Sequence, residues 1–280
     1  MLRTAPVRVL DDSDVAEALA LLAADPVANV LIAARVEAAG LDPWRLGAEI
    51  WGYAEHGRLQ ALCHAGANLA PTRASTQAVR AFADKARRQG RRCSSIVGPA
   101  EAVRSLWSAL RETWGPARDV RPSQPLLSIA RPSPVPADPA VRPVRPDEVD
   151  AVLPACVAMF TEEVGVSPIG GDGGLLYRSR VAELVGAGRS YARIEDGRVL
   201  FKAEIGSATA QACQVQGVWV DPAYRGRRLS IAGMAAVVQI ALQSVAPVVS
   251  LYVNDYNEPA RRAYSRVGFA EIGTFASVLF

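Results

Sequence analysis

Two kinds of hydrophobic pattern alternate along the chain and predict a mixture of strands and helices. Apolar residues spaced three and four apart predict helices, and short runs rich in β-branched residues predict strands. In the first half we expect helices at 15–24, 26–39, 75–89 and 100–114, with strands at 49–55, 58–64 and 93–97. In the second half we expect helices at 147–160, 174–186, from 228 onward and at 258–266, with strands at 191–195, 199–205, 213–220, 248–253 and from 271 onward.

A proline-rich stretch, "RPSPVPADPAVRPVRPDEVD" at 131–150, separates the two halves. It holds six prolines and no long apolar run, which is typical of an extended linker. Each half opens in the same way, with a short strand, an acidic helix start and an apolar helix. We therefore predict two similar domains of the α/β (α+β) class, at 1–135 and 136–280, each a mixed, mostly antiparallel sheet flanked by helices.

Composition and charge narrow the classes of function. Half of the residues are hydrophobic and the net charge is +3, so the chain is typical of globular proteins and a nucleic-acid partner is not indicated. The four cysteines lie far apart without a CxxC pair, so neither a zinc site nor a disulfide framework is predicted. A reducing cytoplasm is the expected location, since the N-terminus turns acidic where a signal peptide needs an apolar core.

An uncharged run at 229–253 is long enough for a membrane span. Two glutamines and Pro247 interrupt it, however, and its pattern changes from an alanine-rich helix to a β-branched strand. We expect a buried helix followed by a buried strand, and no membrane contact.

The stretch "VWVDPAYRGRRLS" at 218–230 joins a strand to this apolar helix and carries three arginines. The first backbone N–H groups of a helix lack intrahelical partners and favour anions. Arg225, Arg227 and Arg228 add positive charge at the same place, so a pyrophosphate is the expected occupant. A solvated surface loop is the alternative.

These residues resemble the acetyl-CoA motif of the GNAT superfamily of N-acetyltransferases, in which a strand is followed by Arg or Gln, two residues, Gly, one residue, then Gly or Ala. Arg225 matches the first position and Gly226 keeps the common Arg-Gly step, whereas Arg228 and Ser230 depart from the two small positions. The resemblance implies that acetyl-CoA binds to Val218, Trp219, Val220, Arg225, Gly226, Arg227, Arg228, Leu229, Ser230 and Asn257.

A second block, "LYVNDYNEPARRAYSRVGF" at 251–269, resembles the later motif of the same family. Asn257 suits a helix N-cap, and in the family the matching Asn contacts the pantetheine arm. The resemblance makes Tyr264 the acid that protonates the departing thiolate; a core aromatic is the alternative. The first half, at "SIVGPAEAVRSLW", lacks the arginines and the glycine spacing, so we interpret it as a degenerate copy of the fold.

The general base must be a carboxylate, because both histidines, His56 and His64, lie in the first half. Glu204, on the strand beside the expected cofactor strand, is the first choice. Glu162 and Glu163, in the expected substrate-side loop, come second. Cys213 as a covalent acetyl carrier is disfavoured, because nothing beside it activates a thiolate.

The resemblance implies an acetyl-CoA-dependent N-acetyltransferase, without a metal, that transfers acetyl directly to a primary amine of a small molecule or protein. The tandem arrangement is similar to two-domain actinobacterial members, including mycothiol-synthase-like proteins. A catalytically impaired CoA-binding or protein-interaction module is the alternative. A tRNA-dependent aminoacyl transferase is disfavoured by the mild charge. The acceptor amine is left open, as is a homodimer.

Overall fold

The structure is a computed structural model that describes residues 7–171 and 173–280, arranged in two compact units. Unit 1 contains the residues up to Leu126, the segment Tyr252–Tyr256 and the C-terminal segment Glu271–Phe280. Unit 2 contains Leu127–Leu251 and Asn257–Ala270. The units therefore differ from the linear division expected at residues 135 and 136, because two late segments of the chain lie in unit 1.

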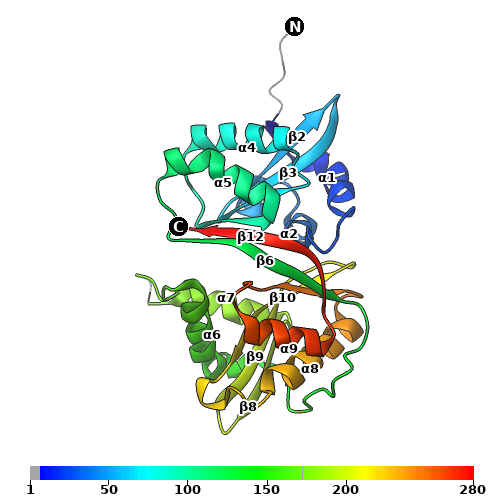
Figure 1. Cartoon of the computed structure of the whole chain (residues 1–280), viewed down its shortest axis with the longest axis vertical. Coiled ribbons are helices and arrows are strands. Elements are labelled where there is room, and N and C mark those ends of the chain that lie inside the picture. The colour runs from blue at the N-terminus through cyan, green and yellow to red at the C-terminus, as the bar shows by residue number, and fades with distance from the viewer. Residues whose placement is uncertain (1–6, 172) are drawn as a thin grey trace. The chain divides into compact units, whose positions relative to one another are not determined.

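Unit 1 is built on seven strands in the order β1-β2-β3-β4-β5-β12-β6. The pairs β1–β2, β2–β3, β3–β4 and β5–β12 are antiparallel, and β4–β5 is parallel. Helices α4 and α5 pack together against one apolar cluster and α1 and α2 against another (Figure 1). The elements are β1 Val7–Val9, η1 Asp12–Asp14, α1 Val15–Leu22, α2 Val30–Ala39, α3 Pro43–Leu46, β2 Glu49–Glu55, β3 Arg58–Ala65, β4 Asn68–Thr72, α4 Thr76–Gln89, β5 Ser95–Pro99, α5 Ala100–Trp114, β6 Asp119–Ile129 and β12 Ala270–Leu279.

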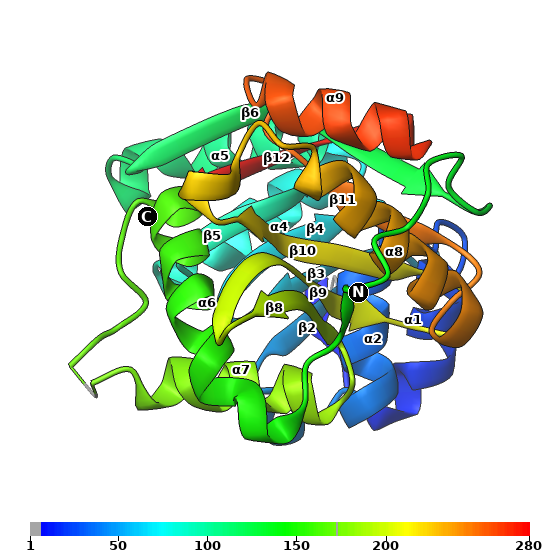
Figure 2. The ribbon, with the colours of Figure 1, turned by 90° about the horizontal axis from the view of Figure 1, so that it is seen from below.

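Unit 2 has the strand order β11-β10-β9-β8-β7. Helices α6 and α7 lie on one side of these strands and α8 on the other (Figure 2). Gly233 of α8 approaches the Phe201 ring of β9. The elements are β7 Arg142–Pro143, η2 Pro146–Glu148, α6 Val149–Val164, α7 Leu175–Gly186, β8 Ser190–Glu195, β9 Arg198–Ala208, β10 Cys213–Val220, η3 Pro222–Tyr224, α8 Leu229–Ser244, β11 Val249–Tyr252 and α9 Glu258–Val267.

The predicted fold class is confirmed, with helices flanking mixed, mostly antiparallel strands. The pattern did not predict β4 or β6, and both contain prolines, which cannot donate to a sheet ladder. In β6 the carbonyl of Pro125 still accepts from the N–H of Val253 at 3.2 Å. A proline is therefore tolerated where the partner segment needs an acceptor and not a donor.

The uncharged run at 229–253 forms helix α8 followed by strand β11, as expected. In the part of the chain that the structure describes, no helix combines the length and apolar character needed to cross a membrane.

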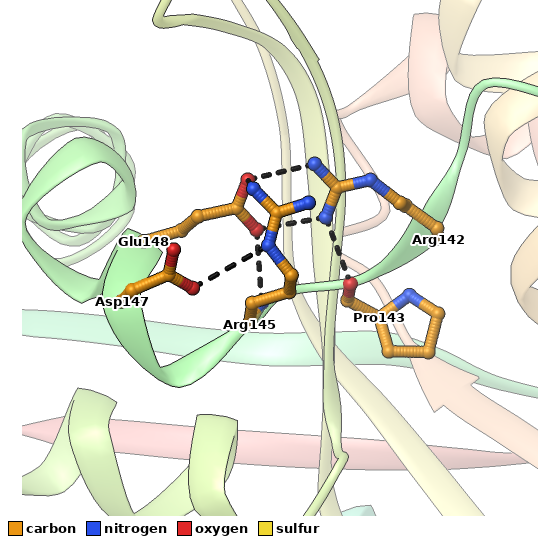
Figure 3. A network of polar contacts seen from close by, with 5 residues as sticks. All are labelled: Arg142, Pro143, Arg145, Asp147 and Glu148. Carbon is orange, nitrogen blue, oxygen red and sulfur yellow. Dashed lines mark hydrogen bonds and ion pairs between the residues drawn. The ribbon is translucent and has the colours of Figure 1, made fainter.

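A polar network fixes the start of α6 (Figure 3). Both terminal nitrogens of Arg142 donate to the carboxylate of Glu148, each at 2.7 Å, and the backbone N–H of Arg145 donates to the same carboxylate at 2.9 Å. The hydrogen bonds from Arg142 are the main cause that lowers the pKa of Glu148 to about 2. The acidic helix start read from the sequence thus ties strand β7 to the turn η2, directly before α6.

Candidate active site

Strand β10 carries a β-bulge at Gly217. The register pairs Gln216 with Glu204 but Trp219 with Lys202, so Gly217 and Val218 stand opposite a single residue of β9. The φ of Gly217 is +61°, in the left-handed region that favours glycine. A glycine inside a strand pattern is the sequence signal that could have found this bulge.

Beyond the bulge, β10 parts from β11. Their parallel register consists of two residue pairs and ends at Gln214 and Ser250. At the far end of β10 the N–H of Asp221 donates to a β9 carbonyl at 3.0 Å. Because successive N–H groups of a strand point to opposite sides, those of Val218 and Val220 point away from β9. They face the side on which the register with β11 has ended.

The loop from β10 to α8 has two left-handed residues, Gly226 at φ +77° and Arg228 at φ +63°. This conformation is uncommon for an arginine, and it is the one a glycine adopts easily. The backbone therefore keeps the geometry of a small residue although the side chain departs from the family pattern. Within the described residues no side-chain hydrogen bond caps α8, so the positive end of its dipole and its first N–H groups are available to an anion.

The arginines of this loop have different surroundings. Arg225 donates to the last carbonyl of β10 at 3.0 Å and to Glu162 of α6 at 2.7 Å. The indole N–H of Trp219 donates to the same carboxylate at 3.1 Å. The guanidinium of Arg227 lies 5.0 Å from the ring centroid of Tyr224. Arg225 thus braces the loop against α6, a link that the sequence did not reveal.

Glu162 and Glu163 lie in the last turn of α6 and not in a loop, because α6 continues four residues beyond the predicted end at Phe160, to Val164. Burial first, and then the charge of Glu163, raises the pKa of the Tyr264 phenol.

Helix α9 places the two residues of the second motif. Asn257 caps the helix, its side-chain oxygen accepting from the N–H of Ala260 at 3.3 Å, as expected from the sequence. Tyr264 is buried and packs edge to face with Phe269, with ring centroids 6.0 Å apart. The Asn257 oxygen is thus already engaged in capping.

Glu204 lies on β9, the strand next to β10, as predicted, but forms part of a buried cluster that the sequence did not reveal. The Lys202 Nζ is 2.6 Å from Oε1 of Glu204, and the Cys156 thiol donates to the same oxygen at 3.5 Å. Lys202 is 1% exposed and Glu204 5%. The Tyr177 hydroxyl donates to the Cys156 carbonyl at 2.9 Å. The Lys-x-Glu spacing on one strand, which puts both side chains on one face, was the available signal.

The surroundings of the Cys213 thiol bear on its possible use as an acetyl carrier. Burial raises the pKa of the Cys213 thiol to about 12, which opposes its use as an acetyl carrier. Among residues 7–171 and 173–280, no group of three or more His, Cys, Asp or Glu side chains is placed to hold a metal ion.

Two family models match different parts of the chain. Residues 171–269 match the acetyltransferase (GNAT) family, and residues 48–152 match a domain of unknown function, DUF4081. No curated protein sequence matches the chain significantly.

Solved structures share the fold over nearly the whole chain. A Drosophila protein is 14% identical, with a TM-score of 0.67 and 99% of each chain covered. A GCN5-related N-acetyltransferase from Sphaerobacter thermophilus is 19% identical, with a TM-score of 0.59, covering 97% of this chain and 94% of that one. A tandem GNAT protein from the clavulanic acid biosynthesis pathway is 15% identical, with a TM-score of 0.56 and 97% of each chain covered. The GNAT family model covers residues 171–269, and the solved structures show that nearly the whole chain shares the fold of proteins that include a tandem GNAT protein.

Proposed function

We propose that unit 2 binds acetyl-CoA and transfers the acetyl group directly to a primary amine of a small molecule or protein. The observation that carries this proposal is the sequence of features along β10. A bulge at Gly217 is followed by two N–H groups that face the parted strands, and then by a helix start without a side-chain cap.

These residues fit the cosubstrate. The N–H groups of Val218 and Val220 are suited to hold the thioester carbonyl, because backbone donors fixed in a strand stabilise a developing negative charge. The first turn of α8, beginning with Leu229 and Ser230, is suited to the pyrophosphate, with Arg227 and Arg228 adding positive charge.

Proton transfers are assigned to residues of unit 2. An amine must lose a proton to attack, and the leaving sulfur must gain one from a positioned acid. We assign the first role to Glu204, beside the bulge, and the second to Tyr264. The reducing cytoplasm stays part of the proposal, in line with the free buried thiols Cys63, Cys93, Cys156 and Cys213.

The test follows release of free CoA thiol from acetyl-CoA in the presence of a panel of primary amines. Tyr264→Phe is expected to lower kcat by about 100-fold or more, the usual contribution of a general acid. Tyr191→Phe, which removes the hydroxyl of another buried tyrosine in unit 2, is the matched control and should keep the rate. Acetyl-CoA binding without transfer to any amine would favour the alternative, a CoA-binding or protein-interaction module.

A further inference from the structure

Lys202 is an unusual residue for this chain. Among its 31 lysine and arginine residues, only Lys85 and Lys202 are lysines. Lys202 is 1% exposed, whereas the side chain of Lys85 is half-buried and lies over the Trp51 ring at 5.1 Å. An arginine supplies a buried charge at least as well, since it is always protonated and more weakly hydrated. What a lysine adds is an amine that becomes a nucleophile once it loses a proton.

The amine of Lys202 lies between a carboxylate and the bulge. Its Nζ is 2.6 Å from Oε1 of Glu204. Both that Nζ and the second oxygen of Glu204 are 3.2 Å from the position that a Cβ on Gly217 would occupy, and the Met159 methyl is 3.1 Å from it. The missing side chain of Gly217 therefore keeps the bulge in direct reach of an amine and its proton acceptor.

We propose that Lys202 is itself an acetyl acceptor, so that the protein acetylates its own Lys202 from acetyl-CoA. The inference rests on the proposed function, which puts the thioester carbonyl on the N–H groups of Val218 and Val220, directly after Gly217. The Lys202 amine, the Glu204 carboxylate and the N–H groups that would hold the thioester carbonyl then all lie at the Gly217 bulge of unit 2.

The transfer balances without any further reactant. Glu204 accepts one proton from the Lys202 ammonium, and Nζ forms a bond to the thioester carbonyl carbon while the carbon–sulfur bond breaks. The sulfur takes the phenol proton of Tyr264. A second proton leaves Nζ and restores the phenol, and Glu204 releases its proton to water. The products are N-acetyl-Lys202, free CoA thiol and one proton.

The neighbouring nucleophile does not compete. Burial is the main cause that raises the pKa of the Cys156 thiol to about 11, so it remains a hydrogen-bond donor to Glu204 near neutral pH. Acetylation leaves Lys202 neutral, and Glu204 then faces the bulge without its ion-pair partner. The reaction therefore occurs once per chain and changes the charge beside the Gly217 bulge.

The experiment incubates the full chain with acetyl-CoA carrying a deuterated methyl group, without added amine, and follows intact mass and peptide mapping. We expect one labelled acetyl group per chain, mapped to Lys202. The matched variants are Lys202→Arg, which keeps the charge and should take up no label, and Lys85→Arg, which should label like the parent. Tyr264→Phe should slow labelling at least tenfold.

Several outcomes would overturn the inference. Peptide mapping of the parent chain alone decides it if Lys202→Arg folds poorly. Equal label on Lys85 and Lys202 means chemical acetylation. Thiol release with added amines while Lys202 stays unlabelled overturns the inference and leaves the proposed function standing. Absence of acetyl-CoA binding by calorimetry overturns both.

Discussion

Two junctions between a strand and a helix occupy equivalent places in the two units. In unit 1, β4 is antiparallel to β3, parallel to β5 through two residue pairs, and leads into α4. In unit 2, β10 is antiparallel to β9, parallel to β11 through two residue pairs, and leads into α8. The shared topology makes the local chemistry of the two junctions directly comparable.

The junctions differ in how the helix begins. The Ser75 hydroxyl caps α4 by accepting from the N–H of Ala78 at 3.2 Å, whereas α8 begins after the left-handed Arg228 without such a cap in the described part of the chain. Pro71 also removes a backbone donor from β4, where β10 presents two beside its bulge. Unit 1 thus caps its helix start with a side chain, and unit 2 leaves the equivalent N–H groups available for the proposed cosubstrate.

The largest effect is expected at the buried ion pair of unit 2. Glu204→Met should cost about 3–5 kcal/mol of unfolding free energy, because it leaves the Lys202 charge buried and unpaired. The double variant Lys202→Met/Glu204→Met should recover most of this loss. Chemical denaturation measures both, and a double variant no more stable than the single one would contradict the pairing.

Unit 1 is expected to carry a pH dependence between pH 6.5 and about pH 4. Burial first, and then the charge of Arg35, lowers the pKa of His64 from 6.5 to about 4. The folded state therefore resists a proton that the unfolded state accepts, so stability is full above pH 6.5 and is lost as the pH falls towards about 4. The total loss is about 3 kcal/mol. His64→Asn should flatten this profile of denaturation against pH, and the exposed His56→Asn should leave it unchanged.

The bulge provides the next test. Gly217→Ala should cost about 2 kcal/mol, since alanine is strained at positive φ and its methyl group meets crowded neighbours. Gly197→Ala, at φ +74° with open space around it, isolates the backbone cost and should lose about 1 kcal/mol. Equal losses of stability for the two variants in thermal unfolding would show that Gly217 is needed only for its positive φ and not for the space beside it.

The smallest effect compares the two helix starts directly. Ser75→Ala should cost about 1 kcal/mol, the usual effect of losing an N-cap. Ser230→Ala should change the unfolding free energy by less than about 0.5 kcal/mol, because no cap is lost. If Ser230→Ala lowered the unfolding free energy as much as Ser75→Ala, the Ser230 side chain would stabilise the start of α8 as Ser75 stabilises that of α4, and the two junctions would not differ.

The sequence identified the junction of unit 2 but compared it with the wrong part of unit 1. It set "SIVGPAEAV" against the arginine loop, whereas that stretch is β5 and the start of α5. The equivalent strand, β4, was not predicted because Pro71 interrupts its pattern. Periodicity finds long buried elements, and a short strand with a proline depends on its partners for existence.

The chemistry of the site was only partly visible in the sequence. The positions of Asn257, Tyr264 and Glu204 follow from helix and strand periodicity. Contacts between segments far apart in sequence do not follow from periodicity. Examples are those of Cys156 with Glu204 and of Glu162 with Arg225. Unit 1 also depends on contacts between distant parts of the chain. Gln124 donates a hydrogen bond to Asn254 at 2.9 Å and accepts one from the Ser277 hydroxyl at 2.6 Å.

The most direct measurement is a calorimetric titration of acetyl-CoA into the full chain and two matched variants. Ser230→Asp puts a negative charge in the first turn of α8, and Ser75→Asp puts one at the equivalent place in unit 1 while keeping a good cap. We expect one site per chain, weakened at least about tenfold, or about 1.4 kcal/mol, by Ser230→Asp and unchanged by Ser75→Asp. No binding, two sites, or a site that depends on Ser75 and not on Ser230 would contradict the assignment of the cosubstrate to unit 2.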